Sequence, residues 1–65
     1  MFYRDNQSGE TYIMRGEGVY GGKKEPVYIL ENKTTGKVLV LDKTFFTVII
    51  LHKDGTRQKL YEEIT

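Results

Sequence analysis

The residues VLVLDKTFFTVIIL at positions 38–51 decide the fold that we expect for this chain. They contain two apolar runs, VLVL at 38–41 and VIIL at 48–51, and both are rich in the β-branched residues that favour strands. Neither run alternates apolar with polar residues, as a strand with one face in water does. We therefore expect two strands that are covered on both faces. Between them, Asp42 can accept hydrogen bonds from the free amides of one helical turn near 42–45.

Outside this segment, further apolar runs are separated by clusters of Gly, Asn and Asp, which is typical of a β meander. The predicted strands are 2–4, 10–20, 25–31, 37–41, 47–52 and 56–61. The connection 32–36 ends in Gly36, as a short hairpin with a left-handed closing residue requires. Asp54-Gly55 predicts a tight hairpin turn in which both residues have positive φ. The predicted fold is all-β: one domain spanning 1–65, a small, strongly bent antiparallel barrel or roll of five or six strands.

The composition limits how such a domain is stabilised and what it binds. A chain of 65 residues buries only roughly 60% of the surface that it exposes when unfolded, and the absence of cysteine excludes disulfides and thiolate metal sites. The net charge is +1 and the two signs alternate along the chain, which does not favour one basic face for nucleic acid. The first residues show no basic stretch followed by an apolar run, so we expect a cytoplasmic protein with no membrane association.

The chain offers few groups for catalysis. His52 is the only histidine and Ser8 the only serine; Ser8 lies in a predicted polar loop and His52 at the predicted end of a strand. Nucleophilic catalysis needs a nucleophile, a base and an orienting group within hydrogen-bond reach, and nothing in the sequence brings these two residues together. We therefore predict a non-enzymatic protein with no catalytic residue, no metal site and no cofactor.

The glycine-rich stretch GEGVYG at 16–21 matches the pattern of a dinucleotide-binding loop letter for letter. That loop works because a helix begins at its third glycine, whereas here a strand is predicted to follow. We interpret Gly16 and Gly18 as the place where a long strand bends. The alternative is a mobile hairpin that binds an anionic ligand or an acidic protein surface. The candidate binding residues of that hairpin and the following strand are Gly18, Tyr20, Gly21, Gly22, Lys23, Lys24 and Tyr28.

The apolar runs predict a core and a second apolar face. The predicted core residues are Val27, Ile29, Val38, Val40, Val48 and Ile50, and the residues predicted on the opposite faces are Leu39, Leu41, Ile49 and Leu51. This second face can be covered by the terminal segments, by a partner protein or by a second copy of the chain, and we treat it as a candidate self-association surface. Among the aromatic residues, Tyr12 and Phe46 lie within apolar patterns and are predicted to be core. Tyr3, Tyr20, Tyr28 and Tyr61 can either line the barrel ends or form a binding surface.

The order of features resembles a family of short bacterial and phage proteins, the domain-of-unknown-function family 1653. The residues that carry the resemblance are Tyr3-Arg4, Gly9 with Tyr12, Val27-Tyr28, Thr35-Gly36, Phe45-Phe46 and Asp54-Gly55. The sequence departs from the family pattern by lacking the His that usually follows the opening Tyr-Arg, and by its glycine-rich stretch. The resemblance implies an SH3-like small barrel and no particular activity, so it assigns no site residue.

These observations favour a binding module encoded by a phage or another mobile element. Such a module would bind and inhibit a host protein or sequester a small anionic ligand, and it would work in the host cytoplasm. The first alternative is a nucleic-acid-binding barrel that uses Tyr20 and Tyr28 with Lys23, Lys24, Lys33 and Lys37. The second is an accessory subunit of an enzyme, which the sequence does not distinguish from the first two hypotheses.

Overall fold

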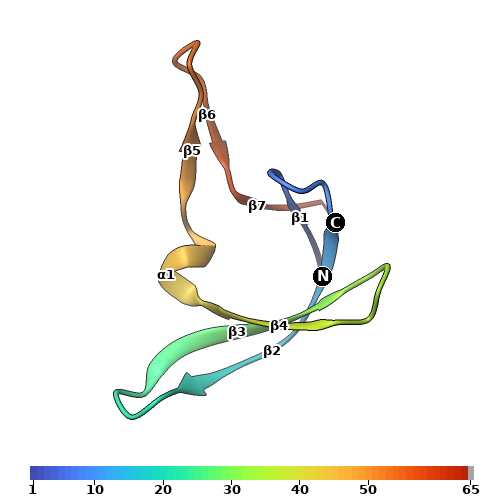
Figure 1. The fold of residues 1–65 in the computed structure, drawn as a ribbon, viewed down its shortest axis with the longest axis vertical. Helices are drawn as coiled ribbons and strands as arrows, with labels where there is room; N and C mark the ends of the chain where they lie inside the picture. Colours follow the sequence, from blue (N-terminus) through green and yellow to red (C-terminus); the bar gives the residue numbers. More distant parts are fainter. Residues whose placement is uncertain (65) are drawn as a thin grey trace.

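The chain forms seven short strands and one helical turn in a computed structural model that describes residues 1–64 (Figure 1). The elements are β1 (Phe2–Asp5), β2 (Thr11–Tyr20), β3 (Glu25–Asn32), β4 (Val38–Asp42), α1 (Lys43–Phe46), β5 (Ile49–Leu51), β6 (Arg57–Lys59) and β7 (Tyr61–Glu63). The prediction of a mostly β fold with a helical turn after the fourth strand is confirmed.

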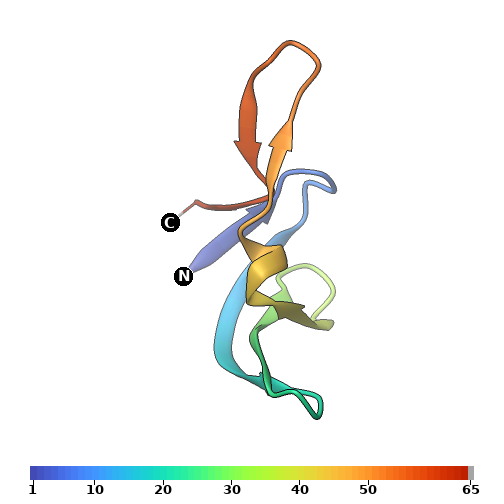
Figure 2. The same ribbon diagram turned by 90° about the vertical axis from the view of Figure 1, so that its left-hand side faces the viewer.

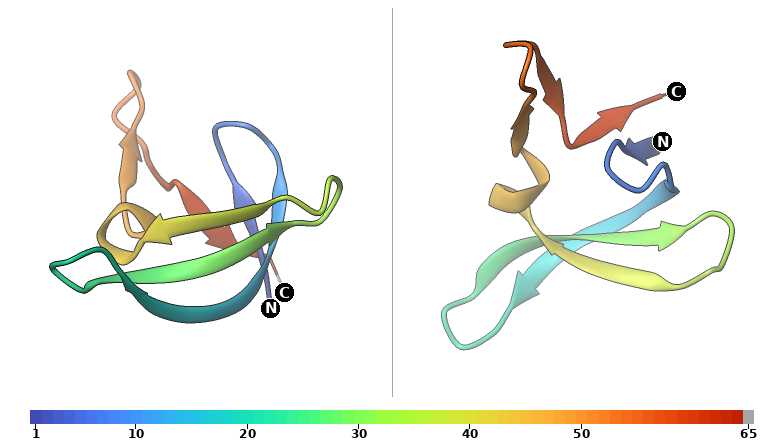
Figure 3. Two further views of the ribbon diagram at one scale, coloured as in Figure 1. Left: turned by 60° about the horizontal axis from the view of Figure 1, so that its bottom comes forward. Right: turned by 45° about the horizontal axis from the view of Figure 1, so that its top comes forward.

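All strands are antiparallel and form two sheets. Five strands form one sheet in the order β4-β3-β2-β1-β7, and β5 pairs only with β6 in a separate hairpin. The last strand therefore returns to lie beside the first, and the two ends of the chain are close together (Figures 1 and 2). The five-stranded sheet curves strongly, yet no closed barrel forms among residues 1–64 (Figure 3). The predicted strong bend is present, and the two outer strands of the sheet remain open edges.

The bend lies in β2, where the pairing with β3 shifts between Met14 and Gly16. A β-bulge of this kind adds a residue to one strand and increases its local twist. Neither Gly16 nor Gly18 has positive φ, and a Cβ atom built on either would meet no atom within 4 Å. The predicted bend is confirmed, but glycine is not sterically required there.

Asn32 holds the hairpin between β3 and β4. Its buried side-chain Oδ1 accepts hydrogen bonds from the amides of Thr34 (2.8 Å) and Thr35 (3.0 Å), and its Nδ2 donates to Glu10 (3.2 Å). Gly36 closes the hairpin with φ of 76°, as the sequence predicted. These bonds satisfy the buried amide and fix the register in which Leu30 faces Leu39.

The helical turn α1 also forms for the predicted reason. Asp42 accepts a hydrogen bond of 2.7 Å from the amide of Thr44, which satisfies one of the free amides at the start of the turn. The turn ends at Thr47, whose hydroxyl donates to the Thr44 carbonyl oxygen. Its main consequence is that Phe46 lies over the concave face of the sheet, against rings from three strands.

Two predictions for the C-terminal region are wrong. In the turn at Asp54-Gly55 only Gly55 has positive φ, 88°, because the loop has three residues and the Asp54 carboxylate accepts hydrogen bonds from Thr56. The predicted strand 56–61 is two strands, since the chain turns at Leu60. The Leu60 side chain is buried and its amide donates to the Val48 carbonyl oxygen. The chain therefore has seven strands, not five or six.

The predicted core on the fourth strand is on the wrong face. Val38 and Val40 are exposed, whereas Leu39 and Leu41 are half-buried on the concave face, opposite Leu30 and Tyr28. The run VLVL has no polar residue on either face, so the sequence does not show which alternate residues point inward. The prediction holds for the buried Val27. It fails for the exposed Val48, and Ile29 and Ile50 are only half-buried.

Little of the chain is buried. Only four apolar side chains among residues 1–64 are buried, namely Val27, Leu30, Leu60 and Tyr61. The radius of gyration is 12.7 Å, against about 10.7 Å for a compact domain of this length. The accessible surface is 4854 Å², against about 4300 Å² for a typical monomer of this mass. The β5–β6 hairpin accounts for part of this openness, because it projects away from the sheet (Figure 1).

Leu30 should therefore be the most sensitive single position for stability. It is the one side chain of the described residues with no exposed surface, so Leu30→Ala should lower the free energy of unfolding by about 2–5 kcal/mol. Val40→Ala, on the neighbouring strand but exposed, should change it by about 0.5 kcal/mol or less. Urea denaturation followed by circular dichroism measures both. Equal losses for the two variants would contradict the assignment of faces.

Candidate functional site

An aromatic cluster joins parts of the chain that are far apart in sequence. Phe46 of α1 stacks on Tyr61 of β7, with ring centroids 5.2 Å apart and planes 8° from parallel. It also meets Tyr3 of β1 edge to face at 5.1 Å, and Tyr28 of β3 at 4.8 Å. Tyr12 of β2 meets the other side of the cluster through Tyr61, at 6.3 Å. Aromatic pairs in these geometries contribute stability beyond the area that they bury.

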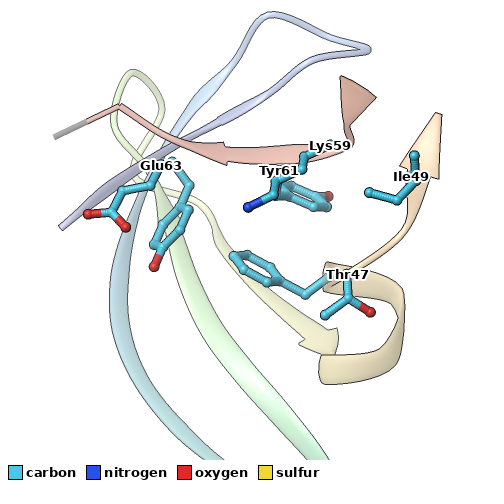
Figure 4. A pocket seen from close by; sticks show the side chains of 7 residues that line it. Thr47, Ile49, Lys59, Tyr61 and Glu63 are labelled. Atoms are coloured by element: carbon cyan, nitrogen blue, oxygen red, sulfur yellow. The ribbon is translucent and has the colours of Figure 1, made fainter. Parts of the chain in front are cut away.

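A pocket of about 280 Å³ opens beside this cluster. Its lining residues are Tyr3, Phe46, Thr47, Ile49, Lys59, Tyr61 and Glu63. Figure 4 shows the Tyr61 ring in the middle of the group, with Ile49 on one side and Glu63 on the other. Rings and an aliphatic side chain thus form the walls, and one cationic and one anionic side chain complete the lining. The lining surface is about equally polar and apolar, and ligand pockets commonly combine apolar walls with polar groups that orient the ligand.

Hydrogen bonds at the chain ends hold the strands that carry this pocket. Asn6 lies just after β1, and its side-chain Nδ2 donates to the Lys59 carbonyl oxygen (2.7 Å) and to the Glu62 carboxylate (3.1 Å). Its backbone N–H donates to the Leu60 carbonyl oxygen (2.8 Å). Arg4 pairs with the same Glu62 carboxylate at 3.3 Å. The pocket residues of β1 and β7 are therefore positioned by contacts between the two ends of the chain.

Burial and nearby charge change the acidity of two pocket tyrosines. Burial raises the pKa of Tyr61 above 10.0, and the charges of Asp5 and Tyr12 act in the same direction. Burial also raises the pKa of Tyr3, with the carboxylate of Glu63 and then Tyr28 as further causes. Both hydroxyls therefore stay neutral over the physiological pH range, and the Tyr3 hydroxyl donates to the Met1 Sδ at 2.8 Å.

These pKa shifts predict a loss of stability in alkali. A tyrosine with a raised pKa in the folded state favours folding below its unfolded pKa of about 10, and this contribution is lost as pH rises through the higher folded value. We expect the unfolding midpoint to fall as pH rises above about 10. We also expect tyrosinate absorbance to include a component that titrates later than in the denatured chain. Tyr61→Phe should reduce both effects. An unchanged late component in Tyr61→Phe would exclude Tyr61 as its source.

The predicted glycine-rich hairpin lies at the far end of the sheet, away from this pocket (Figure 1). Gly18 and Tyr20 are exposed near the end of β2, and the turn 21–24 contains Gly21, Gly22, Lys23 and Lys24, all exposed. The amide of Lys24 donates to the Gly21 carbonyl oxygen, and β3 follows directly. No helix begins there, so the turn lacks the amides that a dinucleotide-binding loop uses.

Lys24 has φ of 54°, a left-handed conformation that costs a lysine energy and a glycine little. Lys24→Gly should therefore stabilise the protein by about 0.5–1 kcal/mol. Lys23→Gly is the matched control and should give no gain, because Lys24 is the only described non-glycine residue with positive φ. Thermal unfolding of the two variants provides the comparison. A gain in Lys23→Gly but not in Lys24→Gly would contradict the turn geometry.

The remaining candidate residues are separated. Tyr28 is half-buried in the aromatic cluster, and the Lys43 ammonium lies 4.9 Å from its ring centre. Lys43 also donates to the Glu17 carboxylate, and this hydrogen bond raises the pKa of Lys43. Lys33 and Lys37 lie at the β3–β4 hairpin, and Lys33 covers the Phe2 ring at 4.8 Å. Lys33 and Lys37 therefore do not share a surface with Tyr20 and Tyr28, as the nucleic-acid hypothesis would require.

The four residues predicted to mediate self-association are also divided. Leu39 and Leu41 are half-buried on the concave face of β4, whereas Ile49 and Leu51 lie on β5 with exposed side chains. They therefore do not form one continuous apolar face.

The pocket residues Tyr3, Phe46 and Tyr61 were not identified together from the sequence. The signal for Phe46 was present, since a capped helical turn predicts a defined direction for the residue that ends it. Nothing local indicated that the first and last strands pair, and this pairing brings Tyr3 beside Glu63.

A second pocket of about 440 Å³ lies near the β3–β4 hairpin. Its lining residues are Asp5, Ser8, Glu10, Tyr12, Asn32, Thr35, Lys37, Val38 and Leu39. No group of three or more His, Cys, Asp or Glu side chains within residues 1–64 is arranged to hold a metal ion. Among the same residues, no helix has the length and apolar character needed to cross a membrane.

No protein-family model, curated protein or solved structure matches this chain. The resemblance to the domain-of-unknown-function family 1653 therefore stays a prediction.

Proposed function

We propose that this chain is a non-enzymatic protein-binding module whose contact site is the pocket beside Phe46 and Tyr61. The pocket would receive an apolar side chain of a partner protein, with Lys59 and Glu63 making polar contacts around it. The observation that carries this proposal is the open aromatic pocket, which is lined by residues of four strands and a helical turn. Rigid aromatic side chains in a pocket are frequent centres of protein–protein interfaces.

The exposed apolar surface supports the same proposal. Ten large apolar side chains among residues 1–64 are exposed, more than twice the number that are buried. Three of them, Val48, Ile49 and Leu51, lie on or just before β5 in the β5–β6 hairpin, which forms an arm beside the pocket. A partner that fills the pocket can also cover this arm. Its binding would supply part of the apolar burial that a chain of this size does not achieve alone.

The competing hypotheses have weaker support. Lys23 and Lys24 form an exposed pair at a hairpin tip and line neither of the two pockets described, so a small anionic ligand would have little enclosure there. For nucleic acid, Lys23 and Lys24 precede β3 and Lys33 and Lys37 follow it, so the two pairs are separated by the length of that eight-residue strand. Phosphate binding along one groove would need these lysines on a shared face. An inhibitor of a host protein and an accessory subunit of an enzyme would both act by binding another protein, so both agree with the proposal.

The expected SH3-like barrel is kept as a proposal in an opened form. Two features support it: β2 bends so that it serves both halves of the sheet, and β7 returns beside β1. The β5–β6 hairpin would be an insertion between α1 and the last strand of that arrangement.

The proposal is tested by replacing a pocket residue that is not needed for folding. Ile49 is 50% exposed and lines the pocket, so Ile49→Asp should weaken binding by about tenfold or more while the melting temperature changes little. Val19→Asp is the matched control and should bind as the parent does, because Val19 is 65% exposed on β2 and lies outside both the pocket lining and the β5–β6 hairpin. The probes are peptides selected on the parent protein from a displayed random library.

A second measurement does not depend on finding a natural partner. We expect 4-ethylphenol and indole, which mimic aromatic side chains, to shift the NMR signals of Phe46, Tyr61 and Ile49. Shifts confined to the 21–24 turn would refute the pocket as the contact site. Selected peptides that bind Ile49→Asp as tightly as the parent would refute it as well.

A further inference from the structure

The two edges of the five-stranded sheet differ in how they are protected. Natural proteins protect an edge by making it short, charged, bulged or covered, because unpaired backbone groups can add a strand. The β7 edge is short, and its three residues include Glu62 and Glu63. The β4 edge has five residues, four of them apolar, with no proline and no shift in its pairing with β3. Figure 3 (right) shows β4 as the outermost strand on its side of the sheet.

The backbone groups that β4 leaves unpaired can be identified from its pairing with β3. The amide of Asn32 donates to the Lys37 carbonyl oxygen, so these two residues form a hydrogen-bonded pair. Hydrogen-bonded pairs alternate along an antiparallel ladder, and therefore Leu39 and Leu41 direct their backbone groups to β3. The N–H and C=O groups of Val38 and Val40 point away from the sheet. The side chains of these same two valines are exposed on the convex face.

We propose that β4 pairs edge to edge with β4 of a second copy of the chain, antiparallel about a two-fold axis at Leu39. Because Val38-Leu39-Val40 reads the same in both directions, a two-fold axis at Leu39 places only apolar residues of this segment opposite one another. In this register Val38 of each copy lies opposite Val40 of the other, and Leu39 lies opposite Leu39. Each Val38–Val40 pair exchanges two backbone hydrogen bonds, so all the unpaired groups of these valines are satisfied.

The occupant is a second copy because the strand is complementary to itself in side chains and in backbone bonding. On the convex face the new pairs join Val40 and Ile29 of one copy to Val38 of the other, which makes a continuous apolar band. Val38 and Val40, which are 65% and 49% exposed in the single chain, would be covered by one another in this pair.

This proposal is independent of the aromatic pocket. The pocket is formed by β1, α1, β5, β6 and β7, and none of its lining residues belongs to β4. A dimer joined through β4 would therefore present two pockets. We propose pairing through the Val38 and Val40 edge in place of the sequence-based hypothesis of self-association through the side chains of Leu39, Leu41, Ile49 and Leu51.

The first test measures mass by light scattering over a hundredfold range of protein concentration. The parent should change from monomer to dimer, and the double variant Val38→Lys with Val40→Lys should bind itself at least about tenfold more weakly. In that variant, lysines of the two copies lie directly opposite one another. The control is Val19→Lys with Leu51→Lys, which adds the same charge at equally or more exposed positions, 65% and 71% against 65% for Val38 and 49% for Val40. A parent that stays monomeric, or a dimer that survives in the β4 variant, overturns the proposal.

The second test measures the register. The chain has no cysteine, so a single introduced cysteine reports only on the dimer. Opposed residues that do not share hydrogen bonds have Cα atoms about 4.5 Å apart, within the range of a disulfide. Leu39→Cys should therefore form a disulfide-linked dimer under mild oxidation. Leu41→Cys should not, because the two introduced thiols would lie about 13 Å apart along the strands. Equal cross-linking at both positions, or cross-linking at 41 alone, would refute the register.

Discussion

The packing of Phe46 against tyrosines of β1, β3 and β7 is the interaction on which the rest of this structure depends. With this packing in place, Leu30 is the only fully buried side chain among residues 1–64, and α1 is the element that places a ring over the concave face of the sheet. The position of Phe46 follows from the Asp42 cap, which starts a helical turn immediately after β4. Through Phe46, this one capped turn packs against Tyr3 near the start of the chain, Tyr28 in its middle and Tyr61 near its end.

The same packing explains why the protein is open. Five aromatic rings, centred on Phe46 and Tyr61, form one cluster, and the chain has too few residues to build a second core under the β5–β6 hairpin or against the convex face. The apolar side chains of these two regions therefore remain in contact with water. A small domain gains relatively little from its own burial, so association with other chains can contribute a large share of its stability.

The two proposed surfaces use different exposed apolar side chains and differ in shape. Near the β5–β6 arm, rings and Ile49 form a concave pocket, which suits the side chain of another protein. At β4, backbone groups and two valines form a straight edge, which suits another strand. Because the two surfaces share no lining residue, occupation of one leaves the other free. A module of this kind can bind its partner as a pair of linked sites, which increases the effective affinity when the partner is also multivalent.

The sequence by itself determined the local elements. The apolar runs predicted most strands, Asp42 predicted the helical turn, Gly36 its hairpin and the 16–18 region the bend of β2, because each depends on the chemistry of adjacent residues. Only the tertiary structure decided which face of VLVL is inside, where the strand 56–61 breaks, and that Tyr3, Phe46 and Tyr61 share a pocket. These features depend on pairing between residues far apart in the chain, above all β1 with β7. A run that is apolar at every position carries no mark of its buried side, so long-range packing alone sets its parity.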